Sequence, residues 1–336
     1  MFAAAALASG AVLSGSLPAA QGSAVSYRQT VQPFRLRASA SCPEVIFLGA
    51  RGSGETTAQF NAEGPNVAAI SKAMHADLSA RHISFASYGI TDGYTADAVS
   101  DFLPTKAELE KLLSFHPWRE FWPDYYDHQV EPFFKSIASG VRATESETKK
   151  WAATCPDSEI VLAGYSQGAM AVHEAEHDLR FASRSALGHV AATILLGDGD
   201  REPGTKAKLF GSASDNAQGI LDYGESSGLV HGTRSDVPLP GSTAEICNAD
   251  DIVCDFGQGW LDDFAAGVLL GGWKGGVAAL TVAVKHAVKV HVSYVRDTAE
   301  SVTWTDPALI SAAKWAAGLV ARNLRELPIG EPGVSR

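Results

Sequence analysis

The segment EIVLAGYSQG, residues 159–168, joins a short apolar run to a serine that is flanked by two glycines. The apolar residues at its start are typical of a buried strand. The residues that follow, from Ala169 to about Phe181, are expected to form a helix. The segment therefore predicts a strand that turns directly into a helix, with Ser166 at the turn.

The glycine spacing around Ser166 carries chemical information. Gly164 and Gly168 have no side chains, so a helix can approach the preceding strand closely at both positions. A sharp turn of this kind exposes the serine hydroxyl above the edge of the sheet, and the N–H of Gln167 can face a developing oxyanion. The five-residue pattern also occurs by chance, so the prediction of a nucleophile depends on the strand and helix around it.

The alternation of strand and helix continues on both sides of this segment. Further strands are expected at about residues 44–48, 83–88 and 190–196, and helices at about 66–78, 144–154 and 307–324. Asp306 and Pro307 suit the N-cap and the first position of the last helix. The pattern predicts an α/β fold, in which helices flank a central parallel sheet of about five strands.

The composition limits the partners and the compartment. With 336 residues, of which 46% are hydrophobic, the chain can bury a large core. A formal net charge of -11 argues against nucleic acid as a partner, because phosphate backbones are bound by clustered Lys and Arg. Residues 1–24 are small and apolar like a signal peptide, without its usual basic start, and an alanine-rich tail is the rival interpretation. We expect a secreted or envelope-associated protein with a linker at 25–41, one domain at 42–327 and a tail at 328–336.

The four cysteines fit two disulfides in an oxidising compartment. Counting alone allows three pairings. Cys247 and Cys254 can meet across one turn, which leaves Cys42 and Cys155, each just before an expected strand, to join each other. A zinc site is disfavoured because the sequence has no CxxC pair.

A nucleophilic serine needs a histidine base, and the histidine needs a carboxylate that fixes its tautomer. In the order serine, acid, histidine, the candidate acids are Asp198, Asp200, Asp222, Asp250 and Asp251. The candidate bases are His173, His177, His189, His231, His286 and His291. Spacing does not choose among them, but a disulfide-closed turn is a rigid platform and favours Asp251.

The chain resembles the cutinases and the cutinase-like esterases of actinobacteria. The resemblance rests on ordered segments: CP at 42–43, ARGS at 50–53, CPD at 155–157, GYSQG at 164–168, CNADDIVC at 247–254 and HVSY at 291–294. It implies a single α/β-hydrolase domain of cutinase type and the same two disulfides.

The resemblance also implies roles for individual residues. Ser166 would be the nucleophile, Asp251 the acid and His291 the base, while Ser53 and Gln167 would form the oxyanion hole. Alternatives remain: Asp250 as the acid, His231 or His286 as the base, and Ser53 as a mere turn cap. Arg51, which the family pattern also holds, is expected to be a structural hydrogen-bonding residue.

Two insertions, at about 101–134 and 256–285, depart from the compact fungal members of the family. The stretch 264–284 is nearly as apolar as a membrane span, but Lys274 and several glycines interrupt it. We expect a helical hairpin near the active-site mouth, packed on the core or acting as a lipid-facing lid. The first insertion carries aromatic residues that would line an acyl pocket or form a satellite core: Trp118, Phe121, Trp122, Tyr125, Tyr126, Phe133 and Phe134.

The expected function is hydrolysis of carboxylic esters through an acyl-enzyme, with no metal or organic cofactor. An open cleft suits polymeric cutin, whereas covering segments suit a lipid or long-chain ester and a transient contact with a lipid interface. The rival functions are an acyltransferase or peptidase with the same triad, and a lipid- or wall-binding protein with an idle triad.

Overall fold

The structure is a computed structural model, and it describes residues 42–97, 131–226, 239–256, 269–270, 279, 282–298 and 301–326. The chain divides into two compact units, Met1–Phe34 and Arg35–Arg336, and all described residues lie in the second unit. The expected signal segment at 1–24, the linker at 25–41, the tail at 328–336 and most of both insertions lie outside the described residues.

The centre of the described unit is a six-stranded sheet in the order β2-β1-β3-β4-β6-β5. Its strands are β1 (Val45–Ala50), β2 (Phe85–Gly89), β3 (Glu159–Tyr165), β4 (Val190–Leu196), β5 (Lys208–Phe210) and β6 (Thr243–Ile246). Each neighbouring pair in this order is parallel. The predicted α/β fold with a parallel sheet is confirmed, with six strands where about five were expected.

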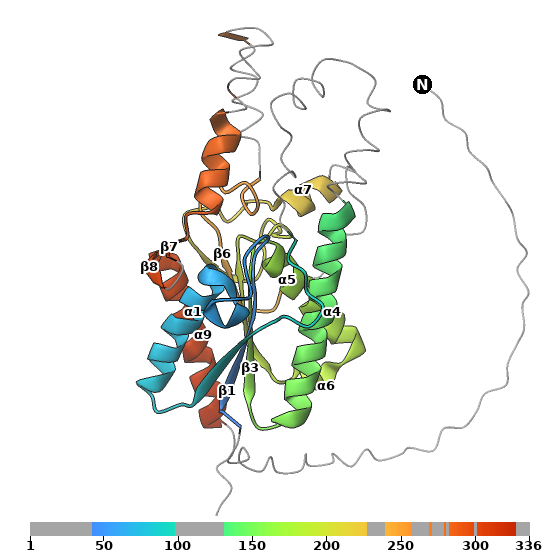
Figure 1. Ribbon diagram of the computed structural model, residues 1–336, viewed down its shortest axis with the longest axis vertical. Helices are drawn as coiled ribbons and strands as arrows, with labels where there is room; N and C mark the ends of the chain where they lie inside the picture. The colour runs from blue at the N-terminus through green and yellow to red at the C-terminus, as the bar shows by residue number, and fades with distance from the viewer. Residues whose placement is uncertain are drawn as a thin grey trace, which may run out of the picture. The chain divides into compact units, whose positions relative to one another are not determined.

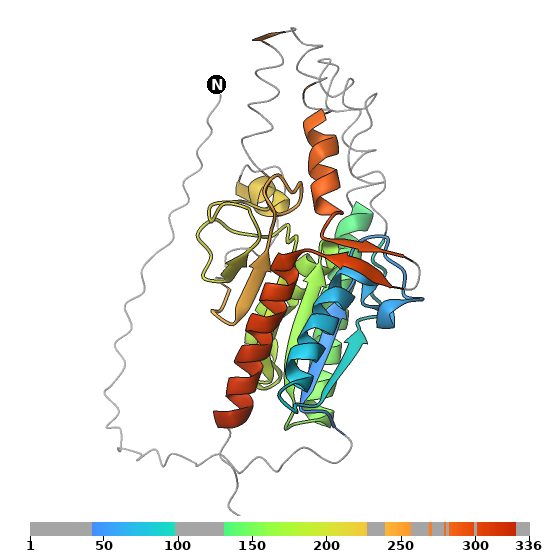
Figure 2. The same ribbon diagram turned by 90° about the vertical axis from the view of Figure 1, so that its left-hand side faces the viewer.

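Helices cover both faces of this sheet (Figure 1). On one face, α1 (Gly64–Ser79) and α9 (Pro307–Glu326) lie side by side (Figure 2). The other face carries α4 (Glu131–Thr154), α5 (Gln167–Ala182) and the short α6 (Arg184–Leu187). In β1 the side chains alternate between the two layers: Val45 and Phe47 pack with the α1 and α9 core, and Ile46 and Leu48 with the α4 and α5 core. Burial on both faces explains the continuous apolar runs in the sequence.

Several elements differ from the sequence prediction. Helix α4 begins at Glu131 rather than near Thr144, and Pro132 lies in its first turn, where a missing N–H is tolerated. Phe133, from the predicted aromatic cluster, is buried in a small core with Ile137 and Met170, which favours the core interpretation for this residue. The other cluster residues, except Phe134, lie outside the described residues.

Short elements complete the described fold. They are the 3-10 turn η1 (Phe60–Ala62), α7 (Ile220–Ser226) and an antiparallel pair of β7 (Val295–Asp297) with β8 (Val302–Thr305). Residues 282–291 are also helical. The carboxylate of Asp306 accepts the N–H of Ala308 at 2.8 Å, which is the expected N-cap of α9. None of the helices in the described ranges has the length and apolarity needed to cross a bilayer.

Two disulfides join all four cysteines of the chain. Cys42, before β1, pairs with Cys155, which follows α4, and Cys247 pairs with Cys254 across the turn after β6. The first disulfide ties the start of the described fold to its centre, and the second closes a turn at the carboxyl end of the sheet.

Candidate active site

Ser166 lies between β3 and α5 in a strained backbone conformation. Its φ of 54° and ψ of -121° belong to a region that residues with side chains rarely adopt. A Cβ atom on Gly164 would lie 2.2 Å from the carbonyl oxygen of Gly168, and one on Gly168 would lie 2.3 Å from the carbonyl oxygen of Ala50. The turn can form only because both positions are glycine, as the sequence pattern predicts.

The structure brings Ser166, His291 and Asp251 together. His291 Nε2 lies 2.9 Å from the hydroxyl oxygen of Ser166. Its other ring nitrogen, Nδ1, lies 2.9 Å and 3.0 Å from the two carboxylate oxygens of Asp251. The three side chains therefore form a continuous hydrogen-bonded chain, although 125 residues separate Ser166 from His291 in the sequence.

The competing candidates in the described residues lie elsewhere. His286 and Asp250 are exposed and face each other at 3.7 Å, and neither has a hydrogen bond to the chain of three. His173 pairs with Asp198 at 2.7 Å. His231 lies outside the described residues. Of the candidate histidines in the described residues, His291 is the one that is hydrogen-bonded to the Ser166 hydroxyl.

Asp251 is fully buried, and its carboxylate is held by donors other than the imidazole. One oxygen accepts the N–H groups of Val253 at 2.7 Å and Cys254 at 3.4 Å. The other accepts the hydroxyl of Tyr294 at 2.7 Å. Burial alone would raise the pKa of Asp251, but His291 and these hydrogen bonds outweigh it and hold the pKa below its ordinary value. The group is therefore an anion at neutral pH.

Two tyrosines fix this arrangement, and the sequence analysis assigned neither a role. Burial raises the pKa of Tyr294 well above its ordinary value, so its hydroxyl stays protonated and donates to Asp251. The hydroxyl of Tyr165 donates to the backbone carbonyl of His291 at 2.9 Å, and the Tyr165 ring stacks on the imidazole at 5.2 Å. Both lie inside the quoted segments GYSQG and HVSY, which was the available signal.

Gly197, directly after β4, lies against the imidazole. A Cβ atom there would come within 2.9 Å of His291 Cε1, and the φ of Gly197 is +61°. Only glycine combines this backbone conformation with this close approach. The sequence analysis did not single out this position.

The two predicted oxyanion-hole residues lie on elements next to Ser166. Gln167 is the first residue of α5, where the N–H has no partner inside the helix. Its side-chain oxygen accepts a hydrogen bond from the Ser136 hydroxyl at 2.9 Å. This hydrogen bond holds the Gln167 side chain in one position. Ser53 follows β1, and its buried hydroxyl has no hydrogen-bond partner within the described residues.

Arg51 shapes the loop that carries Ser53. Its guanidinium donates to the backbone carbonyls of Glu55, Ile90, Tyr94 and Thr95 at 2.9 to 3.3 Å. All of these contacts are with main-chain oxygens, and the residue is 4% exposed. Arg51 therefore ties two loops together, in line with the structural role expected from the sequence.

Comparisons with known proteins find partial matches to this chain. Residues 122–264 match the cutinase family model. A cutinase from Didymella rabiei is 26% identical over 65% of this chain and 68% of its own length. The probable carboxylesterase Culp3 of Mycobacterium tuberculosis (strain CDC 1551 / Oshkosh) is 30% identical over 37% of this chain and 43% of its own length. A solved structure, a cutinase-like protein from Cryptococcus sp., is 21% identical, covers 79% of this chain and 100% of its own, and has a TM-score of 0.42.

The matched segment contains the Ser166 turn and the disulfide-closed turn that carries Asp251. The two curated relatives are named as a cutinase and as a probable carboxylesterase. This chain is therefore similar to cutinases over the segment that carries both of these turns.

Proposed function

We propose that this protein is a secreted carboxylic-ester hydrolase in which Ser166, His291 and Asp251 form the catalytic triad. One observation carries the assignment: the unbroken hydrogen-bonded chain from the serine hydroxyl through the imidazole to the carboxylate. The strained backbone at Ser166 supports it, because strain of this kind persists where surrounding structure holds a residue for function.

The geometry supports a two-step reaction. The Ser166 hydroxyl oxygen attacks the ester carbonyl while its proton passes to His291 Nε2, and the anionic Asp251 stabilises the imidazolium that forms. The backbone N–H of Gln167 and the hydroxyl of Ser53 donate to the oxygen that becomes negative. His291 then protonates the departing alcohol, which leaves the acyl group on Ser166. Water, deprotonated by His291, attacks the acyl carbon of this acyl-enzyme. The bond from that carbon to the Ser166 oxygen breaks to release the acid, and His291 returns the proton to the Ser166 oxygen.

The proposed substrate is a lipid or another long-chain ester. Leu269 and Leu270, in the second insertion, are 86% and 91% exposed, which is a high exposure for two adjacent leucines. Such side chains suit transient contact with a lipid interface near the enzyme. Export to an oxidising compartment agrees with the two disulfides, which are rare in the reducing cytosol.

The test is hydrolysis of a graded series of acyl esters by the parent and by Ser166→Ala. We expect a long-chain optimum for the parent and a fall in kcat of roughly a millionfold for the variant, as when a triad serine is removed. Ser185→Ala, an exposed serine on α6, is the matched control and should keep full activity. Equal activity of parent and Ser166→Ala would refute the assignment.

Two rival functions predict other products. An acyltransferase would give mainly transesterified product with competing alcohols, and a peptidase would cleave amide substrates faster than esters. A lipid-binding protein with an idle triad would bind vesicles equally with and without Ser166 and would turn over no ester.

A further inference from the structure

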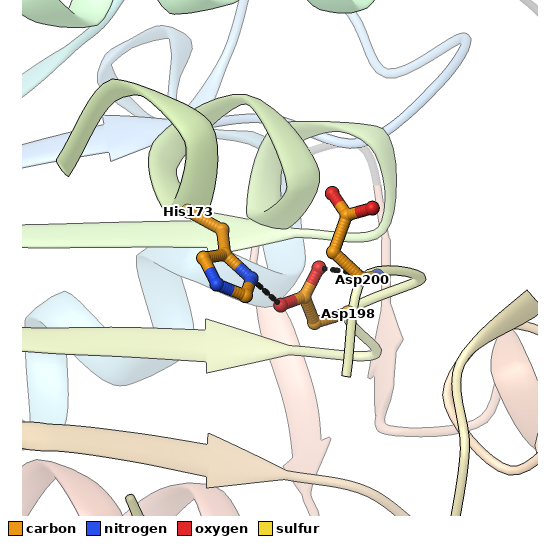
Figure 3. Close-up of side chains that lie close together, drawn as sticks. All are labelled: His173, Asp198 and Asp200. Atoms are coloured by element: carbon orange, nitrogen blue, oxygen red, sulfur yellow. Dashed lines mark hydrogen bonds and ion pairs between the residues drawn. The ribbon is translucent and has the colours of Figure 1, made fainter. Parts of the chain in front are cut away.

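A second group of buried ionisable side chains lies close to Gly197, the residue that packs against the imidazole of His291. His173 comes from α5, and Asp198 and Asp200 come from the turn that follows β4 (Figure 3). They are only 5%, 2% and 2% exposed. The proposed reaction uses none of them, because the acid and base roles are filled by Asp251 and His291.

The three side chains converge closely enough to share one small ligand. One ring nitrogen of His173 and one carboxylate oxygen from each aspartate all lie within 4.8 Å of one another. His173 Nδ1 is 2.7 Å from Asp198, and the other Asp198 oxygen accepts the backbone N–H of Asp200 at 3.2 Å. Figure 3 shows the Asp200 carboxylate beside this pair, without a contact to it.

The Asp200 carboxylate is the group that indicates a ligand at this position. Both of its carboxylate oxygens are buried, and neither has a hydrogen-bond partner within the described residues. Buried carboxylates are normally hydrogen-bonded, paired with a cation or bound to a metal ion, because removing them from water is costly. No protein group in the described ranges meets this need for Asp200.

The surroundings of this group are also short of positive charge. Glu245, on β6, is 1% exposed, and both of its oxygens lack hydrogen bonds within the described part of the chain. Arg201 approaches it only to 3.8 Å. Three buried carboxylates, Asp198, Asp200 and Glu245, thus share one guanidinium and one imidazole. A divalent cation would balance the charge while leaving the imidazole neutral.

We infer that His173, Asp198 and Asp200 form a buried structural site for a divalent transition-metal ion such as Mn²⁺ or Zn²⁺. Imidazole and carboxylate ligands together suit these ions, whereas Ca²⁺ and Mg²⁺ prefer ligand sets made only of oxygen. Coordination replaces the hydrogen bond between His173 and Asp198 and draws Asp200 toward the pair, because ligand atoms around such an ion lie about 2.0–2.2 Å from it.

The position of the site gives the ion a structural role. Asp198 directly follows Gly197, whose backbone lies against the imidazole of His291. An ion held by α5 and by the turn after β4 would fix this turn behind the base without touching the reacting atoms. The site is independent of the proposed triad, so failure of either proposal leaves the other intact.

The experiment measures bound metal and thermal stability of the full chain. The protein is stripped with EDTA, dialysed against Mn²⁺, Zn²⁺, Ca²⁺ or Mg²⁺ and analysed for metal by elemental analysis. We expect about one Mn²⁺ or Zn²⁺ per chain, little Ca²⁺ or Mg²⁺, and a rise in Tm of roughly 5 °C or more at about 100 times the Kd. Asp200→Asn should lose both the bound ion and the rise. Asp215→Asn, which changes an exposed aspartate in the same way, should keep both.

The parent protein alone can overturn the proposal. Less than a tenth of an equivalent of Mn²⁺ and Zn²⁺ after dialysis, with no change in Tm, would exclude the site. Binding that survives unchanged in Asp200→Asn would place the ion elsewhere and equally refute it. If Asp200→Asn does not fold, His173→Gln replaces it with the same two expected losses.

Discussion

At the scale of single residues, the central problem is how a fully buried carboxylate stays charged. Asp251 is 0% exposed to solvent, yet it receives hydrogen bonds from His291, Tyr294 and two backbone N–H groups of its own turn. These donors replace the water that the anion has lost, and they hold its pKa below the ordinary value. An acid held in this way can stabilise the imidazolium throughout the reaction.

Tyr294→Phe tests the part of this support that comes from a side chain. The change keeps the ring but removes the hydroxyl, which donates to the charged carboxylate at 2.7 Å and accepts the backbone N–H of Asn248 at 2.9 Å. Hydrogen bonds to charged groups contribute about 1.5–3 kcal/mol, so we expect kcat to fall roughly tenfold or more while KM is unchanged. Steady-state kinetics measure the effect. Tyr88→Phe, at a partly exposed site, is the control and should be neutral. Full kcat in Tyr294→Phe would show that the backbone donors suffice.

Ser53→Ala tests the proposed oxyanion hole. The Ser53 hydroxyl is buried and lacks a hydrogen-bond partner among the described residues. This is expected of a group that donates to a substrate oxygen once the substrate binds. Loss of one such donor typically lowers kcat by about 10²–10³-fold. We expect a fall in that range with unchanged KM and unchanged Tm. If Ser53 is only a turn cap, the same variant will instead lower Tm and leave kcat intact.

At the scale of elements, the two disulfides have separable effects. The Cys42–Cys155 disulfide joins residues that are 113 positions apart, and its loop does not contain Asp251. The Cys247–Cys254 disulfide joins residues that are 7 positions apart, and its loop contains Asp251. A disulfide restricts the unfolded chain more when its loop is long. The long loop should therefore matter more for stability, and the short one for the position of Asp251, the proposed catalytic acid.

Paired Cys→Ser variants measure this difference. Loop entropy predicts losses of about 4.8 kcal/mol for Cys42–Cys155 and about 2.4 kcal/mol for Cys247–Cys254 in the free energy of unfolding. We expect kcat to fall only in the second variant, because its turn carries Asp251 and the N–H donors of Val253 and Cys254. Urea unfolding and kinetics at a temperature where both variants are folded supply the two values. Equal kcat in the two variants would contradict this assignment.

At the scale of the whole molecule, the sequence predicted the features that depend on local pattern. The buried strands were visible as apolar runs, and the Ser166 turn was visible because two glycines are sterically required around it. The turn that carries Asp251 could be predicted because Cys247 and Cys254, which close it, are 7 residues apart. The choice of His291 among the histidines came from the resemblance, since spacing alone left six candidates.

The features that the sequence did not predict depend on contacts between distant segments. Strands β5 and β6 have 3 and 4 residues, too few for a periodic signal, and they form because the edge of the sheet offers partners. The hydrogen bond from Tyr294 to Asp251 spans 43 residues. The sequence indicated His173, Asp198 and Asp200 only as separate candidate acids and bases. The three side chains come together only when α5 packs against the sheet.

Glu63 links three elements of the fold at one buried position. It precedes α1, it is 2% exposed, and its side chain packs where a Cβ atom on Gly49 of β1 would lie. Burial raises its pKa to about 7, and hydrogen bonds with Ser87 of β2 and Ser71 of α1 offset only part of this effect. One oxygen of Glu63 has no hydrogen-bond partner within the described residues.

This raised pKa predicts how stability varies with pH. Between the unfolded value of 4.5 and the folded value of about 7, the folded protein binds the Glu63 proton and the unfolded chain does not. The stability that protonated Glu63 contributes is therefore fully present below pH 4.5 and is lost as pH rises through about 7. The free energy of unfolding falls by on the order of 3 kcal/mol over this range. Glu63→Gln removes this loss, so its free energy of unfolding relative to the parent should rise by a similar amount from pH 5 to pH 8 in urea unfolding. Glu326→Gln, at an exposed position on α9, should show no such rise, and parallel pH curves for the parent and Glu63→Gln would disprove the raised pKa.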